Sequence, residues 1–225
     1  GEGYTELTLI DRDGEGMAAL SAALDLPVLT VPMDVSDPDA WTALSTDRAL
    51  DGLQAAVICA GVSEAAPISD LSYDTWRKVL AVNLDGAFLA MKAALASISD
   101  GGSIVAVGSA TGRKAVAMTA AYGASKAGLA QLVRVAALEA APRNVRVNTV
   151  APGGVKTPMF SDQDWFADMA KADGEDAAWS ALSAGTPLGR LAEADEIARA
   201  IHWLLSDAAA LMTGATLDVD GGYGI

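Results

Sequence analysis

The chain has 225 residues, 52% of them hydrophobic, which is enough to bury a sizeable core within one domain spanning residues 1–225. A formal net charge of −14 would repel a phosphate backbone, so nucleic acid is excluded as an expected partner. The single Cys59 excludes an internal disulfide, has no Cys or His cluster around it to bind a metal, and fits a reducing cytoplasm. No uninterrupted apolar run looks long enough to span a bilayer, so no membrane partner is expected.

Strand and helix patterns alternate along the whole chain. Strands are predicted at 6–10, 28–33, 55–60, 103–107, 145–150 and 215–219, and helices at about 14–24, 37–50, 70–97, from Tyr122 onward, and at about 194–206. Asp37 is the expected N-cap of its helix, with Pro38 at the first helical position. A looser segment covers 158–189. Near-continuous apolar strands between helices predict an α/β fold, a Rossmann-type doubly wound parallel sheet with helices on both faces.

Three polar residues around the 103–107 strand stand out. Tyr122 and Lys126 are four residues apart and therefore share one face of a helix, and Ser109 lies just past the end of the strand. A positive neighbour favours the charged form of tyrosine and lowers a pKa that is ordinarily about 10. A phenol tuned in this way can exchange protons near neutral pH. Taken alone, such a pair is more often an aromatic side chain at the margin of the core beside a solvated charge.

Ser109, the run Tyr122 to Lys126 (YGASK) and the later PGGVKTPM segment together resemble the short-chain dehydrogenase/reductase family, and the resemblance covers the whole chain. It implies that Tyr122 is the catalytic acid/base, that Ser109 holds the substrate oxygen, and that Lys126 lowers the tyrosine pKa and binds the nicotinamide ribose. Asn83, in VLAVNLDGAF, falls where the family has a helical asparagine that holds a water in a proton relay to the lysine. Without the resemblance, Asn83 is equally a satisfied polar residue between helices.

The cofactor is expected outside the carboxyl ends of the strands, where ligands of such sheets bind. Asp11 follows the first strand, and a carboxylate there accepts from the ribose 2′-hydroxyl of NAD but repels the 2′-phosphate of NADP, so NAD is predicted. Arg12 would offset that repulsion, but adjacent residues leaving a strand point opposite ways. The resemblance implies further cofactor contacts at Asp34, Val35, Cys59, Ala60, Gly61, Pro152, Gly153, Val155 and Thr157, besides Tyr122 and Lys126.

Two departures from the family pattern are visible. Ile58 and Cys59 replace the two asparagines of the Asn-Asn-Ala-Gly motif, so the hydrogen bonds of those side chains are lost. The first strand and the glycine-rich turn that holds the pyrophosphate are missing, and Gly1-Glu2-Gly3 cannot substitute for them. Because that strand would lie in the middle of the sheet, its loss would expose backbone and apolar surface on both neighbours. We therefore expect that the sequence begins about thirty residues late.

These features predict an NAD(H)-dependent oxidoreductase that interconverts a secondary alcohol and a ketone. Two alternatives stay open: a 3-ketoacyl-thioester reductase of the same family, and a non-catalytic nucleotide-binding or scaffold protein. His202 is the single histidine and is expected to be structural, which argues against a Ser-His-Asp hydrolase.

The substrate and subunit predictions rest on two other stretches. The 158–189 segment combines aromatic and methionine side chains with Asp162, Asp164 and Asp168, which favours a neutral, fairly apolar alcohol or ketone over an anion. The segment Asp218 to Gly222 resembles the family's carboxyl-terminal strand and turn, which commonly takes part in subunit contacts. A homo-oligomer, a tetramer or a dimer, is therefore expected.

Overall fold

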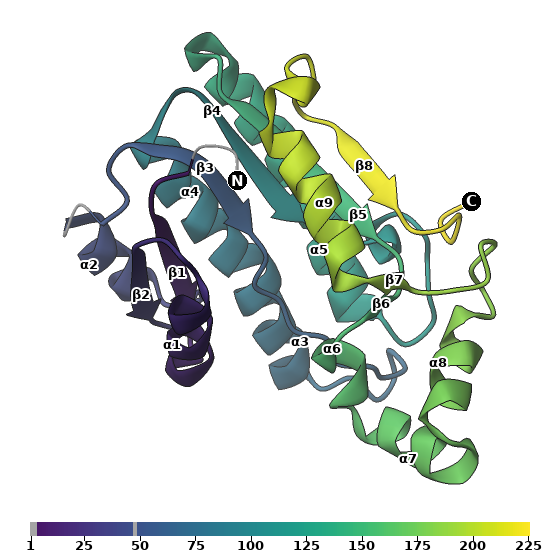
Figure 1. Cartoon of the computed structure of the whole chain (residues 1–225). Coiled ribbons are helices and arrows are strands. Elements are labelled where there is room, and N and C mark those ends of the chain that lie inside the picture. The colour runs from purple at the N-terminus through teal and green to yellow at the C-terminus, as the bar shows by residue number, and fades with distance from the viewer. Residues whose placement is uncertain (1–3, 47–48) are drawn as a thin grey trace.

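The computed structural model describes residues 4–46 and 49–225, so the predictions for Gly1-Glu2-Gly3 lie outside the described residues. Strands and helices alternate as predicted (Figure 1). The elements in chain order are β1 (Leu7–Asp11), α1 (Gly14–Ala23), β2 (Val28–Pro32), α2 (Pro38–Thr46), β3 (Leu53–Ile58), α3 (Tyr73–Leu80), the π-helix η1 (Ala81–Gly86), α4 (Ala87–Ser97), β4 (Ile98–Val107), the 3-10 turn η2 (Ala110–Gly112), α5 (Ala120–Ala140), the 3-10 turn η3 (Ala141–Arg143), β5 (Arg146–Pro152), β6 (Val155–Lys156), α6 (Pro158–Ser161), α7 (Asp164–Asp173), α8 (Glu175–Ser183), β7 (Ala192–Glu193), α9 (Ala194–Leu205), the 3-10 turn η4 (Asp207–Ala209) and β8 (Thr216–Val219).

All the paired strands run parallel. Four of them form a sheet in the order β3-β4-β5-β8, in which Val105 lies opposite Asn148 and Ala151 opposite Asp218. β1 and β2 form a separate parallel pair, and β6 and β7 a third, two-residue pair. Parallel strands joined through helices bring the carboxyl ends of the strands to one edge, where Figure 1 shows the loops after β3, β4 and β5. The α/β prediction is thereby confirmed.

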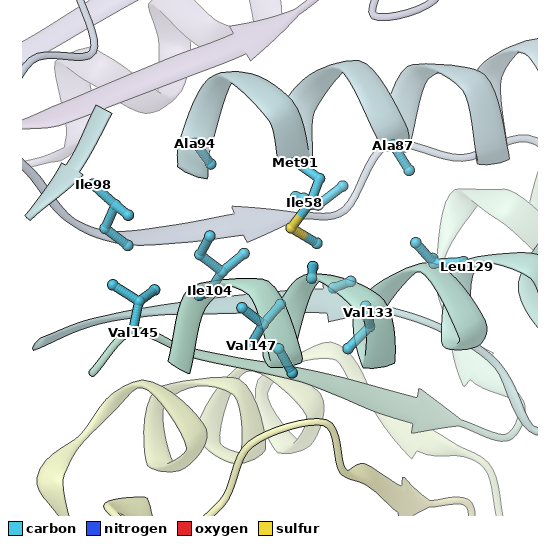
Figure 2. Packing of buried hydrophobic residues seen from close by; sticks show 14 residues of the cluster. Ile58, Ala87, Met91, Ala94, Ile98, Ile104, Leu129, Val133, Val145 and Val147 are labelled. Atoms are coloured by element: carbon cyan, nitrogen blue, oxygen red, sulfur yellow. The ribbon is translucent and has the colours of Figure 1, made fainter. Parts of the chain in front are cut away.

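Helices cover both faces of the four-stranded sheet. On one face α4 and α5 pack against β3, β4 and β5, and Figure 2 shows Met91 and Val133 meeting Ile58, Ile104 and Val147 between them. On the other face α9 packs against β4, β5 and β8. The fully buried branched side chains of β4 and β5 explain why these strands read as continuous apolar runs. The catalytic candidates are thus carried by the most deeply packed part of the molecule.

A cavity of about 730 Å³ lies between the β1–β2 pair and the four-stranded sheet. It is lined by every residue from Leu7 to Asp11 and from Ala55 to Ala60, and successive side chains of a strand alternate in direction, so the cavity runs along the strand edges themselves. Among the described residues β1 pairs only with β2 and β3 only with β4, so both facing edges lack a neighbouring strand. Backbone groups and apolar side chains of β1 and β3 are therefore exposed along these two edges, as expected from the sequence.

Several predicted bounds differ from the structure. The looser 158–189 segment contains three helices, α6, α7 and α8, because aromatic side chains pair across them: the ring centroids of Phe166 and Trp179 are 4.4 Å apart. Gly174, with φ of +92°, ends α7 and separates it from α8. α5 begins at Ala120, before Tyr122, and β4 begins five residues earlier than predicted, at Ile98. The Asp37 prediction is confirmed, since its Oδ1 accepts from the backbone N–H of Asp39 at 2.9 Å.

By length and composition alone, one helical run of the described chain, Tyr73–Ser97, is long and apolar enough to cross a membrane. Asn83, Asp85 and Lys92 interrupt this run, so it is not the uninterrupted apolar stretch that the sequence analysis considered. Buried core helices of soluble domains meet the same criterion. Within this run α4 contributes Met91 and Ala94 to the core beneath the sheet.

Candidate active site

The turn that carries Ser109 lies directly against α5. Gly108 links β4 to this turn and donates its N–H to the carbonyl of Val150 at 2.7 Å. A Cβ at Gly112 would come within 3.0 Å of the Lys126 carbonyl carbon, so only glycine lets the turn approach the helix this closely. The Ser109 Oγ accepts from the backbone N–H of Thr111 at 3.2 Å, which fixes the side chain at the start of η2. The structure thus brings Ser109 to the helix face that carries the candidate tyrosine and lysine.

The Ser109 side chain lies close enough to the Tyr122 phenol to act on its pKa through hydrogen bonding. Burial raises the pKa of Tyr122 above its ordinary value, and the bond from Ser109 only partly opposes this. The predicted lowering of this pKa by Lys126 is therefore wrong, because the loss of water around the buried phenol is the largest influence on it. The phenol remains protonated at neutral pH and is a proton donor in this state.

Lys126 lies beneath the tyrosine with only 4% of its surface exposed. Its Nζ donates to the carbonyl of Val107 at 2.8 Å and lies 5.7 Å from the centroid of the Tyr122 ring. Burial lowers the pKa of Lys126 to about 8, which leaves the ammonium group only partly protonated at mildly alkaline pH. Carbonyl anchoring at the end of β4 holds the amine at the carboxyl edge of the sheet.

Asn83 lies in the π-helical turn η1, where the sequence predicted a locally irregular helix. Its Oδ1 accepts from the N–H of Val62 at 2.8 Å, and its Nδ2 donates to the carbonyl of Val62 at 2.9 Å and to Oγ of Ser125 at 3.1 Å. The amide therefore clamps the segment that follows β3 against α5. A Cβ at Gly61 would lie 3.5 Å from Asn83 Oδ1 and 3.6 Å from Lys126 Nζ, so these three residues come together.

Ser125 is a residue that the sequence reasoning missed. It is fully buried, receives the hydrogen bond from Asn83, and donates its own hydroxyl to the backbone carbonyl of Tyr122 at 2.7 Å. Ser125 thereby joins the asparagine to the catalytic helix. Its position inside the YGASK run, three residues after the tyrosine and on the buried helix face, was the available signal.

A second pocket, of about 190 Å³, lies at the carboxyl ends of β1, β2 and β3. Asp11 and Arg12 both line it, contrary to the expectation that they would face opposite ways. Arg12 lies near enough to Asp34 for its charge to help lower the pKa of that carboxyl group, after the larger contributions of the hydrogen bonds from Ser36. The guanidinium thus already has a negative neighbour. The remaining lining residues are Met33, Val35, Ala60, Gly61, Val62 and Val82.

The other predicted cofactor residues lie at the same sheet edge. Cys59 is exposed at the end of β3, close enough to Asp11 and Lys126 for their charges to act on its thiol. At the end of β5, a Cβ at Gly153 would lie 3.0 Å from the Asp220 carbonyl, so the Pro152–Gly153 turn is packed against the carboxyl-terminal segment. Thr157 donates its hydroxyl to the carbonyl of Val155 at 3.3 Å, which closes the turn at the start of α6.

These residues fit the two ends of a nicotinamide dinucleotide. The second pocket offers carboxylates for ribose hydroxyls and valine side chains for an adenine ring, and Lys126 offers a donor at the other end. The described residues contain no Gly-x-x-x-Gly-x-Gly turn that opens a helix and could hold the pyrophosphate between these two ends. In the described part of the chain, no group of three or more His, Cys, Asp or Glu side chains is arranged to bind a metal ion.

A parallel sheet with a Ser-Tyr-Lys group at its carboxyl edge defines the class of nicotinamide-dependent oxidoreductases with a Rossmann-type fold. A family model described as "Enoyl-(Acyl carrier protein) reductase" matches residues 3–224. The chain belongs to the short-chain dehydrogenase/reductase family.

Three relatives illustrate the range of the family. The chain is 40% identical over 200 residues to a cis-4-hydroxycyclohexanecarboxylate dehydrogenase of Sinomonas cyclohexanicum, covering 87% of this chain and 76% of the relative. It is 34% identical over 221 residues to a protein of Xanthobacter autotrophicus named "Inactive 2-(S)-hydroxypropyl-CoM dehydrogenase 2", covering 96% and 94%. It is also similar to the crystal structure of a short-chain dehydrogenase/reductase from Brucella melitensis, with a TM-score of 0.85, 32% identity and coverage of 98% and 87%.

Proposed function

We propose that the protein is an NAD(H)-dependent oxidoreductase that interconverts a secondary alcohol and a ketone. The observation that carries this proposal is that Ser109, Tyr122 and the buried Lys126 lie together at the carboxyl edge of the sheet. A bound nicotinamide ring would supply or accept the hydride.

The chain's own residues then handle the oxygen and its proton. The phenol of Tyr122 donates the proton to the substrate oxygen during ketone reduction and takes it back during alcohol oxidation. The hydroxyl of Ser109, held by the N–H of Thr111, orients that oxygen against the phenol. Lys126, anchored on the carbonyl of Val107, presents its ammonium group to the nicotinamide ribose. Asn83 holds the segment after β3 in place and thereby orders the proton relay to the lysine.

The preference for NAD over NADP rests on charge in the second pocket. Asp11 would face the ribose 2′-hydroxyl, and the nearby Asp34 carboxyl group offsets the charge of Arg12 that would otherwise favour a 2′-phosphate. We expect Asp11→Ala to narrow the preference for NAD, measured as the ratio of kcat/KM for the two cofactors. A preference for NADP in the unmodified protein would contradict the assignment.

The proposed substrate is a small, neutral and fairly apolar alcohol or ketone. Aromatic contacts among Phe160, Trp165, Phe166 and Trp179 support an apolar surface in the α6–α8 segment, although these rings pack mainly on one another. The relative from Sinomonas cyclohexanicum carries a carboxylate substrate in its name, so small hydroxy acids belong in the same test.

Two alternatives have an observation in their favour. The description of the matching family model favours a reductase of acyl thioesters, including the 3-ketoacyl-thioester reductase that the sequence left open. The Xanthobacter relative named as inactive favours a nucleotide-binding protein without turnover.

The proposed function also includes a homo-oligomer, a tetramer or a dimer, in the cytoplasm. The packed pair α4 and α5 exposes large apolar side chains, with Phe88 at 50%, Val135 at 42% and Leu138 at 79% of their surface, which supports a further subunit contact. The single Cys59 is a free thiol, which supports a reducing compartment.

One steady-state experiment separates these readings. The protein is assayed for NAD and NADP reduction with neutral secondary alcohols, sugar alcohols and hydroxycyclohexanecarboxylates, and for NADH and NADPH oxidation with matching ketones and 3-ketoacyl thioesters. We expect the highest kcat/KM with NAD and a neutral cyclic or apolar alcohol. Preference for thioesters supports the first alternative, and cofactor binding without turnover of any substrate supports the second.

A further inference from the structure

The loop Arg113–Thr119 joins the Ser109 turn to α5, and its first two side chains reach the carboxyl-terminal end of the chain. Lys114 donates its Nζ to the carbonyl of Tyr223, and the same nitrogen lies 4.3 Å from the centroid of the Tyr223 ring. Arg113 forms an ion pair with Asp218 on β8 at 2.5 Å. A charge held over a ring and on a carbonyl is more restrained than a solvated lysine.

Lys114 is also coupled to the candidate catalytic serine through the backbone. Its N–H donates to the carbonyl of Ala110 at 2.9 Å, and the N–H of Arg113 donates to the same carbonyl at 3.0 Å. Ala110 follows Ser109 directly. A displacement of Lys114 therefore moves the turn that orients the Ser109 hydroxyl.

The partner of Lys114 is a rigid turn at the carboxyl terminus. The Asp220 carboxylate accepts from the N–H of Gly222 at 2.9 Å and from that of Gly224 at 2.8 Å. Gly221 and Gly222 adopt φ of +62° and +87°, which glycine tolerates and other residues do not. The Gly221 carbonyl in this turn accepts from the N–H of Leu188 at 3.1 Å, so the turn also contacts the segment that follows α8.

The far end of the loop is held under strain. Met118 has a φ of +68°, a conformation that is costly for a residue with a side chain. Its carbonyl accepts from the N–H of Ala66 at 3.0 Å, in the segment that follows β3. The loop is thus fixed at both ends by parts of the chain that are distant in sequence.

We propose that the carboxyl-terminal turn Asp218–Gly224 positions the loop between Ser109 and Tyr122, and that Lys114 is the positioning residue. This inference rests on the proposed function, because the loop would form the wall on the substrate side of the Ser109 hydroxyl. In this role Lys114 acts on the Ser109 turn through the Ala110 carbonyl rather than on the reacting atoms.

The test compares Lys114→Met, which removes the charge and keeps the aliphatic stem, with Lys114→Arg, which keeps a cation for the carbonyl and the ring. Lys92→Met on the exposed surface of α4 is the matched control. For Lys114→Met we expect kcat to fall about tenfold, since misplacing an orienting group lowers the rate without removing it. The dissociation constant for NADH stays within about twofold, because the cofactor site is untouched. Lys114→Arg recovers most of the rate, and Lys92→Met has none of these effects.

A second measurement does not depend on turnover. Amide hydrogen exchange of residues 110–119 should accelerate in Lys114→Met and not in Lys92→Met, while β4 and β5 stay protected. Size-exclusion chromatography checks that the oligomeric state is unchanged. Faster exchange with an unchanged kcat would overturn the positioning role of Lys114. Unchanged exchange would show that the contact of Lys114 with Tyr223, here called the clamp, does not hold the loop in place. If the unmodified protein reduced no substrate, the proposed function would fail, and the exchange data would still decide whether the clamp exists.

Discussion

The two halves of the molecule differ in how they are held together. The four-stranded half is closed on both faces, and its polar side chains bridge distant elements; Asn148, for example, donates to the carbonyl of Met212 at 2.7 Å and accepts from the N–H of Ala215 at 3.1 Å. The β1–β2 half pairs with no other strand among the described residues and faces the large cavity along one edge. It contacts the rest of the molecule through the cluster around Trp41 and Leu44 of α2.

This difference assigns the two tasks of the site to different environments. The proton chemistry that we propose for Ser109, Tyr122 and Lys126 lies on the closed half, where burial shifts the pKa values of Tyr122 and Lys126. Under the proposed function, recognition of the adenosine end would fall to Asp11 and Asp34 on the open half, where both residues are exposed. Mutations on the closed half should therefore alter stability and proton transfer most strongly.

The largest stability effect is expected at Arg146. Its guanidinium donates to the carbonyls of Leu204, Leu205, Ser206 and Ala209 and so closes the carboxyl end of α9 over the sheet. Arg146→Met leaves these acceptors without the donor and should lower the free energy of unfolding by about 3 kcal/mol in urea denaturation. Lys78→Met, which breaks the exposed ion pair with Glu64, is the control and should change it by less than about 1 kcal/mol. Equal effects of the two variants would show that the Arg146 hydrogen bonds stabilise the closed half no more than an exposed ion pair does.

The pH dependence of turnover tests the burial of Lys126. Because its pKa is about 8, the ammonium group is present below this pH and is lost above it. Ketone reduction, with the phenol of Tyr122 protonated throughout, should therefore be constant near pH 6 to 7 and decline with a midpoint near pH 8, by about tenfold over the next pH unit. In Lys126→Arg, whose guanidinium keeps its proton, this midpoint should disappear even if the overall rate is lower. A profile with the same midpoint in both proteins would assign it to another group.

The same group predicts a stability trend with a definite sign. The pKa of Lys126 falls from 10.5 to about 8 on folding, so between these values the unfolded chain binds more protons than the folded chain. The contribution of this residue to stability should therefore rise with pH across that window. The urea midpoints of the unmodified protein and of Lys126→Met at pH 7.5 and pH 9.5 isolate this contribution. The unmodified protein should gain stability relative to Lys126→Met between pH 7.5 and pH 9.5, and a relative loss across this window would contradict the sign.

The smallest effect is expected at Thr149, inside the closed half. Its Oγ1 is buried and has no hydrogen-bond partner within residues 4–46 and 49–225, which is an unfavourable state for a hydroxyl group. Thr149→Val replaces this group by a methyl of similar shape and should raise the free energy of unfolding by about 1 kcal/mol. A loss of stability would mean that the hydroxyl group is satisfied in solution.

Sequence reasoning predicted the fold from two local signals. Buried parallel strands such as β4 and β5 read as continuous apolar runs, and the caps at Asp37 and Pro38 fixed a helix start. The helices α7 and α8 were missed because their aromatic contacts pair residues more than ten positions apart, as with Phe166 and Trp179. Periodicity in a short amphipathic helix is weak when the apolar side chains pack on each other.

The sequence predicted which residues lie together in the candidate site, but it did not predict the direction of the tyrosine pKa shift. The i,i+4 spacing placed Lys126 beside Tyr122, but the sign of the tyrosine pKa shift depends on how much water surrounds the phenol, which spacing does not contain. The link from Asn83 through Ser125 joins residues 42 positions apart and needed the fold. The approach of Lys114 to Tyr223 spans 109 positions and had no local signal at all.

The measurement that tests the proton-transfer role most directly is the turnover of Tyr122→Phe. The variant keeps the ring over Lys126 and loses only the phenol oxygen. We predict that kcat falls by at least about a thousandfold, within the range of a lost acid/base group, while the dissociation constant for NADH, measured by fluorescence titration, stays within about threefold. Turnover above about a tenth of the unmodified rate, with NADH still bound, would contradict the assignment of Tyr122 as the group that moves the proton.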